Sequence, residues 1–246
     1  MKTKGNKILI TGANSGIGLA LTRKFLELGN QVVGVSRRTE NLSALKNDFL
    51  NLKVYACDLT DDVEFEQLLS TLKTHHGDLT VLINNAGIQY NDDWLKEPDL
   101  TDRIANEIKL NLTVPLQLTA AMLPDLIKQD EAAVVNVTSA MGFVPKYTAP
   151  TYCGSKAGLH IATQALRGQF DANGAKKIHF FELVPPLVST AMTKDRPGAK
   201  MSPEKLVNAF LKGFENNHYE MKIGKVRLLG FIHRFFPELA REMINR

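Results

Sequence analysis

Six short segments that are apolar and rich in β-branched residues recur along the chain, and longer segments with helical periodicity separate them. Several of the short segments are apolar at nearly every position, which is typical of strands covered on both faces of a parallel sheet. We predict strands at residues 7–11, 31–36, 53–57, 79–84, 133–139 and 178–184, and helices near residues 17–28, 61–74, 101–128, 155–171 and 202–215. This alternation predicts an α/β protein with a doubly wound parallel sheet.

The length of the chain and the absence of a linker predict one domain. The 246 residues suit a single large α/β domain with a sizeable core. No stretch rich in proline, glycine and serine divides the sequence, and we find no internal repeat or low-complexity tract. We therefore expect a single domain over residues 1–246.

An irregular segment interrupts the alternation after the sixth strand. Residues 185–200 contain Pro185, Pro186 and Pro197 and follow the carboxyl end of that strand. Ligands of open α/β sheets bind at the carboxyl ends of the strands, so this segment is expected to form a lid over a site. An ordinary surface loop is the alternative.

Charge and cysteine content narrow the class of protein. The net charge is +4, and the basic residues are scattered along the chain, which argues against a nucleic-acid partner. Cys57 and Cys153 are the only cysteines, no apolar segment precedes the first strand, and no apolar run approaches the ~18 residues of a membrane-spanning helix. We expect a cytoplasmic protein with reduced thiols. No metal site is expected, because the adjacent His75 and His76 do not converge on one ion.

A glycine-rich turn joins the first strand to the first helix. Residues 11–18 read TGANSGIG, a G-x-x-x-G-x-G spacing rather than G-x-G-x-x-G. Gly12 allows the tight turn, Gly16 lets the backbone approach a pyrophosphate, and Gly18 permits close packing of helix against strand. The helix N-terminus directs free N–H groups at the anion. This strand–turn–helix placement predicts a dinucleotide site, with a turn that binds nothing as the alternative. The candidate cofactor-binding residues here are Gly12, Asn14, Ser15, Gly16, Ile17 and Gly18.

The end of the second strand indicates which dinucleotide binds. An acidic residue there would hold the ribose 2′-hydroxyl of NAD, but residues 35–38 read VSRR. Arginine binds phosphate by charge and by bidentate geometry, so Arg37 is predicted to bind the 2′-phosphate of NADP, with Arg38 as a stacking or secondary contact. The nearby Glu40 acts against this preference, and solvated surface arginines are the alternative.

A tyrosine and a lysine stand four positions apart where a helix is predicted to open. This spacing places the side chains of Tyr152 and Lys156 on one helix face. A free phenol titrates near pH ~10, and a nearby ammonium lowers that pKa toward neutrality. Ser139 ends the predicted fifth strand, from where its hydroxyl is expected to reach the same pocket. The three groups suit proton transfer to or from a substrate.

These motifs occur in a fixed order: the glycine turn, residues 84–87 reading NNAG after the fourth strand, Asn111 in the long helix, then Ser139, Tyr152 and Lys156. Together they resemble the short-chain dehydrogenase/reductase family in its compact single-domain form. The resemblance extends from the first strand to about residue 190, and it implies a Rossmann-type fold.

The resemblance also implies roles for the matching residues. Tyr152 would protonate the carbonyl oxygen in reduction or act as the base in oxidation, and Ser139 would hydrogen-bond the same oxygen. Lys156 would lower the pKa of Tyr152 and bind the nicotinamide ribose, and Asn111 would hold a water in a proton relay through Lys156. On the cofactor side, the resemblance implies that Asn85, Ala86 and Gly87 line the adenosine, that Asp58 and Leu59 meet the adenine, and that Pro185, Val188 and Thr190 lie at the nicotinamide.

The turn after the sixth strand departs from the family pattern. Pro185-Pro186 stands where the family usually has Pro-Gly, which removes a backbone N–H beside the nicotinamide. This pair and the sequence KIG at residues 222–224 resemble a subgroup encoded beside D-alanylation genes of Gram-positive bacteria. The sequence therefore predicts an NADP(H)-dependent oxidoreductase acting on a small-molecule carbonyl or alcohol. A non-catalytic NADP(H)-binding sensor or scaffold on the same fold is the alternative.

Residues 225–246 form a C-terminal extension that mixes bulky apolar residues with basic ones. Packing onto the domain or onto a neighbouring subunit is its expected role, and peripheral contact with an anionic membrane is the alternative. The resemblance implies a homodimer or homotetramer, paired through the helix of residues 101–128 and the helix after Tyr152.

Overall fold

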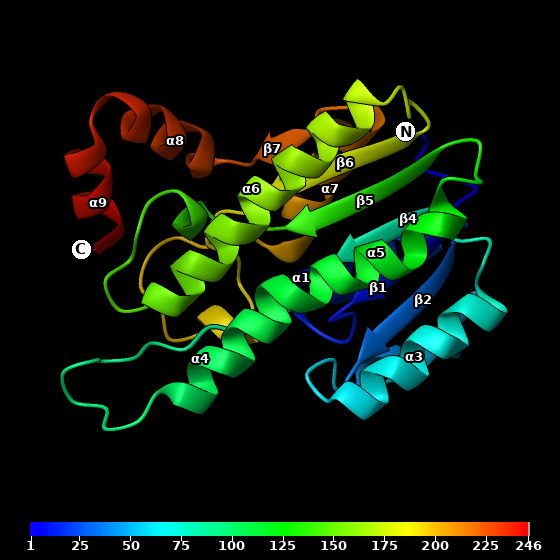
Figure 1. Ribbon diagram of the computed structural model, residues 1–246, viewed down its shortest axis with the longest axis horizontal. Helices are drawn as coiled ribbons and strands as arrows, with labels where there is room; N and C mark the ends of the chain where they lie inside the picture. The colour runs from blue at the N-terminus through cyan, green and yellow to red at the C-terminus, as the bar shows by residue number, and fades with distance from the viewer. Residues whose placement is uncertain (246) are drawn as a thin grey trace.

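A parallel sheet forms the middle layer of the molecule (Figure 1). The computed structural model describes residues 1–245, and within them seven strands pair in the order β3-β2-β1-β4-β5-β6-β7, every pair parallel. The strands are β1 (Lys7–Thr11), β2 (Gln31–Ser36), β3 (Leu52–Ala56), β4 (Val81–Asn84), β5 (Ala132–Val137), β6 (Ile178–Val184) and β7 (Glu220–Lys222). The predicted doubly wound α/β fold of Rossmann type is confirmed.

Helices cover both faces of the sheet, because adjacent residues of a strand point to opposite faces. Ile8 and Ile10 of β1 pack in one core with α1, α2 and α7, whereas Leu9 between them packs in a second core with α3, α5 and α6. The helices are α1 (Gly16–Glu27), α2 (Glu40–Lys46), α3 (Asp62–His75), α4 (Thr101–Ile108), α5 (Val114–Leu126), α6 (Pro150–Ala172), α7 (Pro203–Glu215), α8 (Lys225–Phe235) and α9 (Pro237–Asn245).

The strand order reverses between β1 and β4. After β3 the chain crosses to the other side of β1 and continues outward through β4, β5 and β6. The loops that follow β1 and β4 therefore leave in opposite directions and open a crevice at the carboxyl edge of the sheet. The glycine turn and residues 84–87 lie at this switch point.

Several boundaries differ from the sequence-based expectation. The short elements α2 and β7 were not predicted, because each is too brief to show a clear periodicity. Helix α6 begins at Pro150 rather than residue 155, since proline is well tolerated in the first turn of a helix. Strand β5 ends at Val137, so Ser139 lies two residues beyond it, at the start of a 3₁₀ turn over Ala140–Gly142.

A π-helical turn, Lys109–Thr113, joins α4 to α5. It lies inside the predicted helix of residues 101–128, which is otherwise continuous and runs along one face of the sheet (Figure 1). Such turns insert one residue into an α-helix and are frequent at functional sites.

Polar contacts hold α6 against the sheet. Asn136 on β5 donates to the Thr163 hydroxyl at 2.8 Å, and His160 Nδ1 lies 2.8 Å from the buried carboxylate of Glu182 on β6. These contacts fix the helix that carries Tyr152, so its first turn faces the carboxyl end of β5.

The C-terminal extension folds into α8 and α9, which pack on each other at one end of the sheet (Figure 1). Asn245, at the end of α9, accepts a hydrogen bond from Tyr147 N at 2.8 Å and donates one to Pro145 O at 3.1 Å. The extension thus packs onto the domain, against the loop that precedes α6. No helix among residues 1–245 combines the length and apolarity needed to cross a membrane.

Candidate active site

A cavity of about 790 Å³ opens at the carboxyl edge of the sheet, where the strand order reverses. It extends from the glycine turn past the start of α6 to the segment after β6 and the C-terminal helices. Of the predicted site residues it brings together Gly12, Ser15, Gly16, Ile17, Asn85, Ala86, Gly87, Ser139, Tyr152, Lys156, Pro185, Val188 and Thr190. Seven others lie outside its lining: Asn14, Gly18, Arg37, Arg38, Asp58, Leu59 and Asn111.

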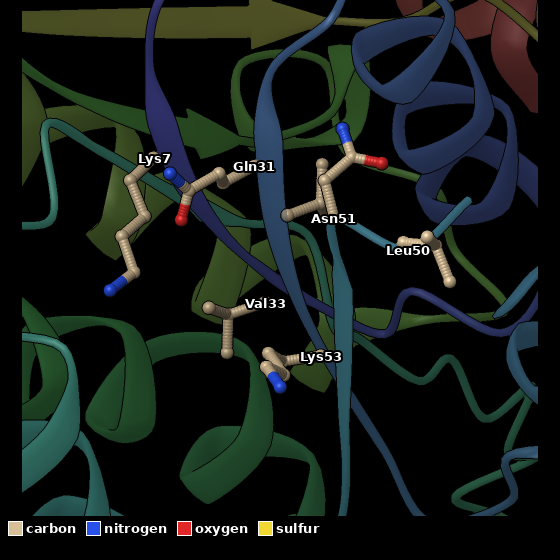
Figure 2. Close-up of a pocket in the computed structure, with 7 residues that line it drawn as sticks. Lys7, Gln31, Val33, Leu50, Asn51 and Lys53 are labelled. Carbon is tan, nitrogen blue, oxygen red and sulfur yellow. The ribbon is translucent and has the colours of Figure 1, made fainter.

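A second hollow, of about 370 Å³, lies at the opposite edge of the sheet (Figure 2). Lys7 and Gln31 begin β1 and β2, and Lys53 lies on β3, so these side chains mark the amino ends of the strands. Lys7 is already paired with Asp78 at 2.5 Å. The hollow holds none of the predicted site residues, and ligands of such sheets bind at the other edge.

The glycine turn fits the pyrophosphate of a dinucleotide. Gly12 and Gly16 have positive φ angles of 65° and 52°, which favour glycine. A Cβ on Gly18 would lie 2.2 Å from Gly12 O, so helix α1 packs directly on the turn. The Ser15 side chain makes no capping hydrogen bond to α1. Residues 15–17 line the cavity, so the first turn of α1 presents its amide groups to an anion there.

The loop after β4 is tied to the same turn. Thr11 Oγ1 accepts hydrogen bonds from the backbone of Asn85 and Ala86, both at 3.0 Å, and the Asn85 amide donates to Thr11 O at 2.9 Å. A Cβ on Gly12 would lie only 2.9 Å from Ala86 Cα. The two loops of the switch point therefore form one wall of the cavity.

Arg37 and Arg38 are exposed just beyond the end of β2. Arg37 Nη1 lies 3.5 Å from the Asp58 carboxylate, beside Leu59 in the loop after β3. Burial opposes the change, but hydrogen bonds from Thr60 and the Arg37 charge lower the pKa of Asp58 overall. Arg37, Arg38 and Asp58 thus lie at the carboxyl ends of β2 and β3, on the side of β1 away from β4.

Asn14 has a structural position inside the glycine turn. Its Oδ1 accepts a hydrogen bond from Leu42 N at 3.1 Å, and its backbone oxygen accepts one from Asn41 at 2.8 Å. Its amide also lies 3.4 Å from a carboxylate oxygen of Glu40. Asn14 therefore fastens the turn to α2, and it holds Glu40 beside the turn rather than at the end of β2.

Tyr152 and Ser139 meet in the cavity. Tyr152 is only 8% exposed, and this burial raises the pKa of its phenol to about 12. A hydrogen bond with Ser139 and the positive charge of Arg196 act in the opposite direction and lower the pKa. Ser139 also accepts a hydrogen bond from Met141 N at 3.2 Å, which fixes its side chain at the start of the 3₁₀ turn.

Lys156 lies beneath Tyr152. Its Nζ is 5.8 Å from the centre of the Tyr152 ring and donates to Val137 O at 2.8 Å. Burial lowers the pKa of Lys156 to about 8, and the carboxylate of Glu107 acts in the opposite direction. An ammonium with a pKa this close to neutrality can exchange protons with its surroundings in the physiological range.

Glu107, on α4, lies outside the cavity lining, but its charge acts on Lys156 and the sequence analysis missed it. It is 1% exposed, and its Oε1 accepts a hydrogen bond from Tyr90 N at 3.0 Å. Its Oε2 is buried and has no hydrogen-bond partner among residues 1–245. Burial raises the pKa of Glu107 to about 7, with Tyr90 and Lys156 opposing the shift and Asp92 adding to it. One acidic residue in a polar helix carries no sequence signal of such burial.

Asn111 occupies the π-helical turn and is fully buried. Its amide donates to Ile88 O at 2.8 Å and to Ser155 Oγ at 3.2 Å, and its Oδ1 accepts from Ile88 N at 3.0 Å. The side chain thus fastens the loop after β4 to α6. Gly87 in that loop is closely packed: a Cβ placed on it would lie 3.0 Å from Asn111 Oδ1 and 3.6 Å from Lys156 Nζ.

The segment after β6 closes the far side of the cavity. Pro185, Val188 and Thr190 line it, and Thr190 reaches the glycine turn, since a Cβ on Gly16 would lie 2.9 Å from Thr190 Cγ2. A short bridge between Val188 and Met201 pins the segment. Leu229 of α8 and Met243 of α9 complete the lining.

The sequence profile of the short chain dehydrogenase family matches residues 6–200, which include the glycine turn, Ser139, Tyr152 and Lys156. The chain belongs to the short-chain dehydrogenase/reductase family. It is therefore an oxidoreductase of the kind that transfers hydride to or from a nicotinamide dinucleotide.

Three relatives of this short-chain dehydrogenase illustrate the similarity. The oxidoreductase DltE of Bacillus subtilis is 37% identical over 227 residues, which cover 90% of this chain and 89% of that protein, and this confirms the resemblance to the D-alanylation subgroup. A short-chain dehydrogenase from Sphingobium yanoikuyae, solved in complex with NADPH, is 26% identical with a TM-score of 0.79 over 88% of this chain and 87% of that one. Another, from Burkholderia cenocepacia in complex with NADP, has a TM-score of 0.85 at 23% identity over 99% of both chains and supports the fold.

Proposed function

We propose that this chain is an NADP(H)-dependent oxidoreductase that interconverts a carbonyl compound and an alcohol, with Tyr152 as the general acid or base. The observation that carries the proposal is the meeting of Tyr152, Ser139 and Lys156 in the cavity that also holds the glycine turn. A protonated phenol and a hydroxyl at the reacting oxygen, with an ammonium nearby to resupply the proton, are the groups that such a reaction needs.

The bound nicotinamide would supply the hydride. The glycine turn would hold the pyrophosphate through the amide groups at the start of α1, and the loop after β4 would support the adenosine. The remaining contacts would come from Arg37 and Arg38 at the 2′-phosphate, from Asp58 and Leu59 at the adenine, and from Lys156, Pro185, Val188 and Thr190 at the nicotinamide half.

Preference for NADP(H) over NAD(H) rests on the end of β2. Arg37 and Arg38 are exposed there, and Arg37 needs only to leave its 3.5 Å pairing with Asp58 to meet a phosphate. No carboxylate follows the strand directly, and Glu40 is turned toward Asn14. The NADPH complex of the Sphingobium relative supports the same preference.

The electrostatics of the site support proton donation by Tyr152. Because burial raises the pKa of the phenol to about 12, Tyr152 carries its proton at neutral pH and can give it to a carbonyl oxygen during reduction. Ser139 would orient the same oxygen. Lys156, with a pKa of about 8, would then return a proton to Tyr152. Asn111 would hold the loop after β4 and helix α6 in place on either side of this transfer.

The direct test is a spectrophotometric screen of NADPH oxidation with aldehydes and ketones, run in parallel on the wild type and Tyr152→Phe. Turnover by the wild type should fall about 10²- to 10⁴-fold in the variant, because the acid is lost. The NADPH dissociation constant, measured by fluorescence, should stay within about twofold. Binding of NADPH without turnover of any carbonyl would instead favour a non-catalytic sensor on this fold.

We also propose a cytoplasmic homodimer or homotetramer that pairs through α5 and α6. Both helices carry an exposed large apolar side chain, Ile127 just after α5 and Ile161 on α6. Light scattering on the purified chain tests this pairing: a monomer at micromolar concentration would contradict it. Cys57 and Cys153 are unpaired thiols, in keeping with a reducing compartment.

A further inference from the structure

Several cations line the cavity. Lys146, Arg196, Lys200 and Lys225 line it together with Lys156, whereas no aspartate or glutamate among residues 1–245 does so. Phosphates of a dinucleotide account for positive charge near the glycine turn and near β2. They do not account for a guanidinium at the tyrosine end.

Arg196 is the lining cation whose charge acts on the Tyr152 phenol. It follows the 3₁₀ turn over Ala191–Thr193, and its backbone N–H donates to Thr193 O at 3.1 Å, which fixes the start of the side chain. Its guanidinium and the Tyr152 phenol are close enough to interact electrostatically. Both side chains line the same cavity as Ser139.

The guanidinium of Arg196 is half-buried and has no carboxylate or carbonyl partner among residues 1–245. Two other arginines are paired, in contrast: Arg103 with Asp92 at 2.8 Å, and Arg167 with Phe180 O at 2.9 Å. A partly desolvated guanidinium without a partner is costly, and its five donors suit a planar oxyanion in bidentate contact.

The cavity that Arg196 lines also has apolar walls. Met141, Met192, Leu229 and Met243 are among its lining residues. A ligand that satisfies both features has an anionic head for the guanidinium and a hydrocarbon body for the methionines and leucine.

We infer that Arg196 binds a carboxylate of the substrate, so that this enzyme interconverts oxo acids and hydroxy acids with an apolar chain. The inference rests on the proposed function and specifies its substrate class. The carboxylate would hold the substrate so that its carbonyl oxygen lies at Tyr152 and Ser139. Phosphonates of similar shape would compete for the same guanidinium.

The test compares oxo acids of six to ten carbons with their methyl esters, using the wild type, Arg196→Met and Lys194→Met. Lys194 is an exposed cation of the same segment that lies outside the cavity lining, so its variant controls for net charge. For the wild type, kcat/KM should be at least about tenfold higher for an acid than for its ester. In Arg196→Met, the loss for the acid should exceed the loss for the ester by about 10- to 100-fold, the range for a hydrogen bond to a charged group. Lys194→Met should behave as the wild type.

Two binding measurements separate this inference from the proposed function. Calorimetry should detect a saturated fatty acid binding to the NADPH-loaded wild type and at least about tenfold weaker binding to Arg196→Met, whether or not any substrate turns over. Equal turnover of acids and esters by the wild type would overturn the inference and leave the proposed function standing. Weaker NADPH binding by Arg196→Met, with equal losses for acids and esters, would also overturn it, because Arg196 would then belong to the cofactor. Absence of turnover with acids, esters and neutral carbonyls alike would instead count against the proposed function.

Discussion

Glu107 and Lys156 are both buried, and each charge shifts the pKa of the other toward its ionised form. The first residue lies on α4 and the second on α6, so this electrostatic coupling links two helices that pack on each other. Burial brings both pKa values close to neutrality, about 7 for Glu107 and about 8 for Lys156. A small change in pH therefore changes the charges that act on this end of the cavity.

Glu107→Gln should move the alkaline limb of the pH–rate profile to lower pH. Removing the carboxylate removes the interaction that raises the pKa of Lys156, so the ammonium loses its proton at a lower pH. The measurement is kcat/KM for carbonyl reduction between pH 5.5 and 9.5. Glu66→Gln, which removes an exposed carboxylate on α3, controls for net charge. An alkaline limb that stays in place in Glu107→Gln would show that the two groups are not coupled in catalysis.

The same substitution should change the pH dependence of stability. In the folded wild type, the pKa of Glu107 is raised from 4.5 to about 7. The protonated carboxyl group therefore gives its full contribution to the free energy of unfolding below pH 4.5, and this contribution is lost as the pH rises through 7. Relative to the wild type, Glu107→Gln should therefore gain stability with rising pH, by at most about 3 kcal/mol at pH 8. Urea denaturation at pH 4.5, 6 and 8 measures the difference. A difference that does not vary with pH would contradict the burial of a carboxyl group there.

Arg37→Met should weaken NADPH binding about 10- to 100-fold, the range for a lost hydrogen bond to a charged group. NADH binding should change by less than about twofold, because NADH has no 2′-phosphate. The measurement is the dissociation constant of each cofactor by fluorescence titration. Arg23→Met is the matched control, since Arg23 is an exposed arginine on α1. Equal affinity of the wild type for both cofactors would contradict the proposed preference.

Gly18→Ala should destabilise the chain by several kcal/mol, since the new Cβ would lie 2.2 Å from Gly12 O and would force α1 away from the turn. Gly168→Ala is the opposite case. Gly168 is exposed within α6 and has open space around its Cα, so alanine should stabilise the helix by about 1 kcal/mol. Thermal unfolding of the two variants should give shifts of opposite sign. Similar shifts for both would show that the contact between α1 and the turn is not tight.

The sequence predicted the layers of the fold because its strands are apolar on both faces and its helices are amphipathic. It predicted the glycine turn and the Tyr152–Lys156 pair because those functions need particular residue types at short spacings. Glu107 escaped prediction, since its burial depends on the packing of α4 against α6 and on the backbone of Tyr90, which no local pattern encodes. Arg196 escaped for a similar reason, because an irregular segment gives no periodicity from which to place a side chain.

Pairing of Lys156 with Tyr152 was expected to lower the pKa of the phenol. In the structure the Lys156 ammonium bonds to Val137 O, and the cation that lowers the pKa of Tyr152 is Arg196. Spacing along a helix places two residues on one face, but the partner of a long side chain is decided by which acceptors lie within reach.

The π-helical turn at Lys109–Thr113 sets the rotational phase between α4 and α5. An α-helix advances about 100° per residue, so deleting one residue from this turn would restore a regular helix and rotate α4 by that angle relative to α5. The apolar stripe of α5 would remain on the sheet, while Glu107 would swing away from Lys156. One inserted residue therefore allows α5 to pack on the sheet while α4 turns Glu107 toward the interior beside α6.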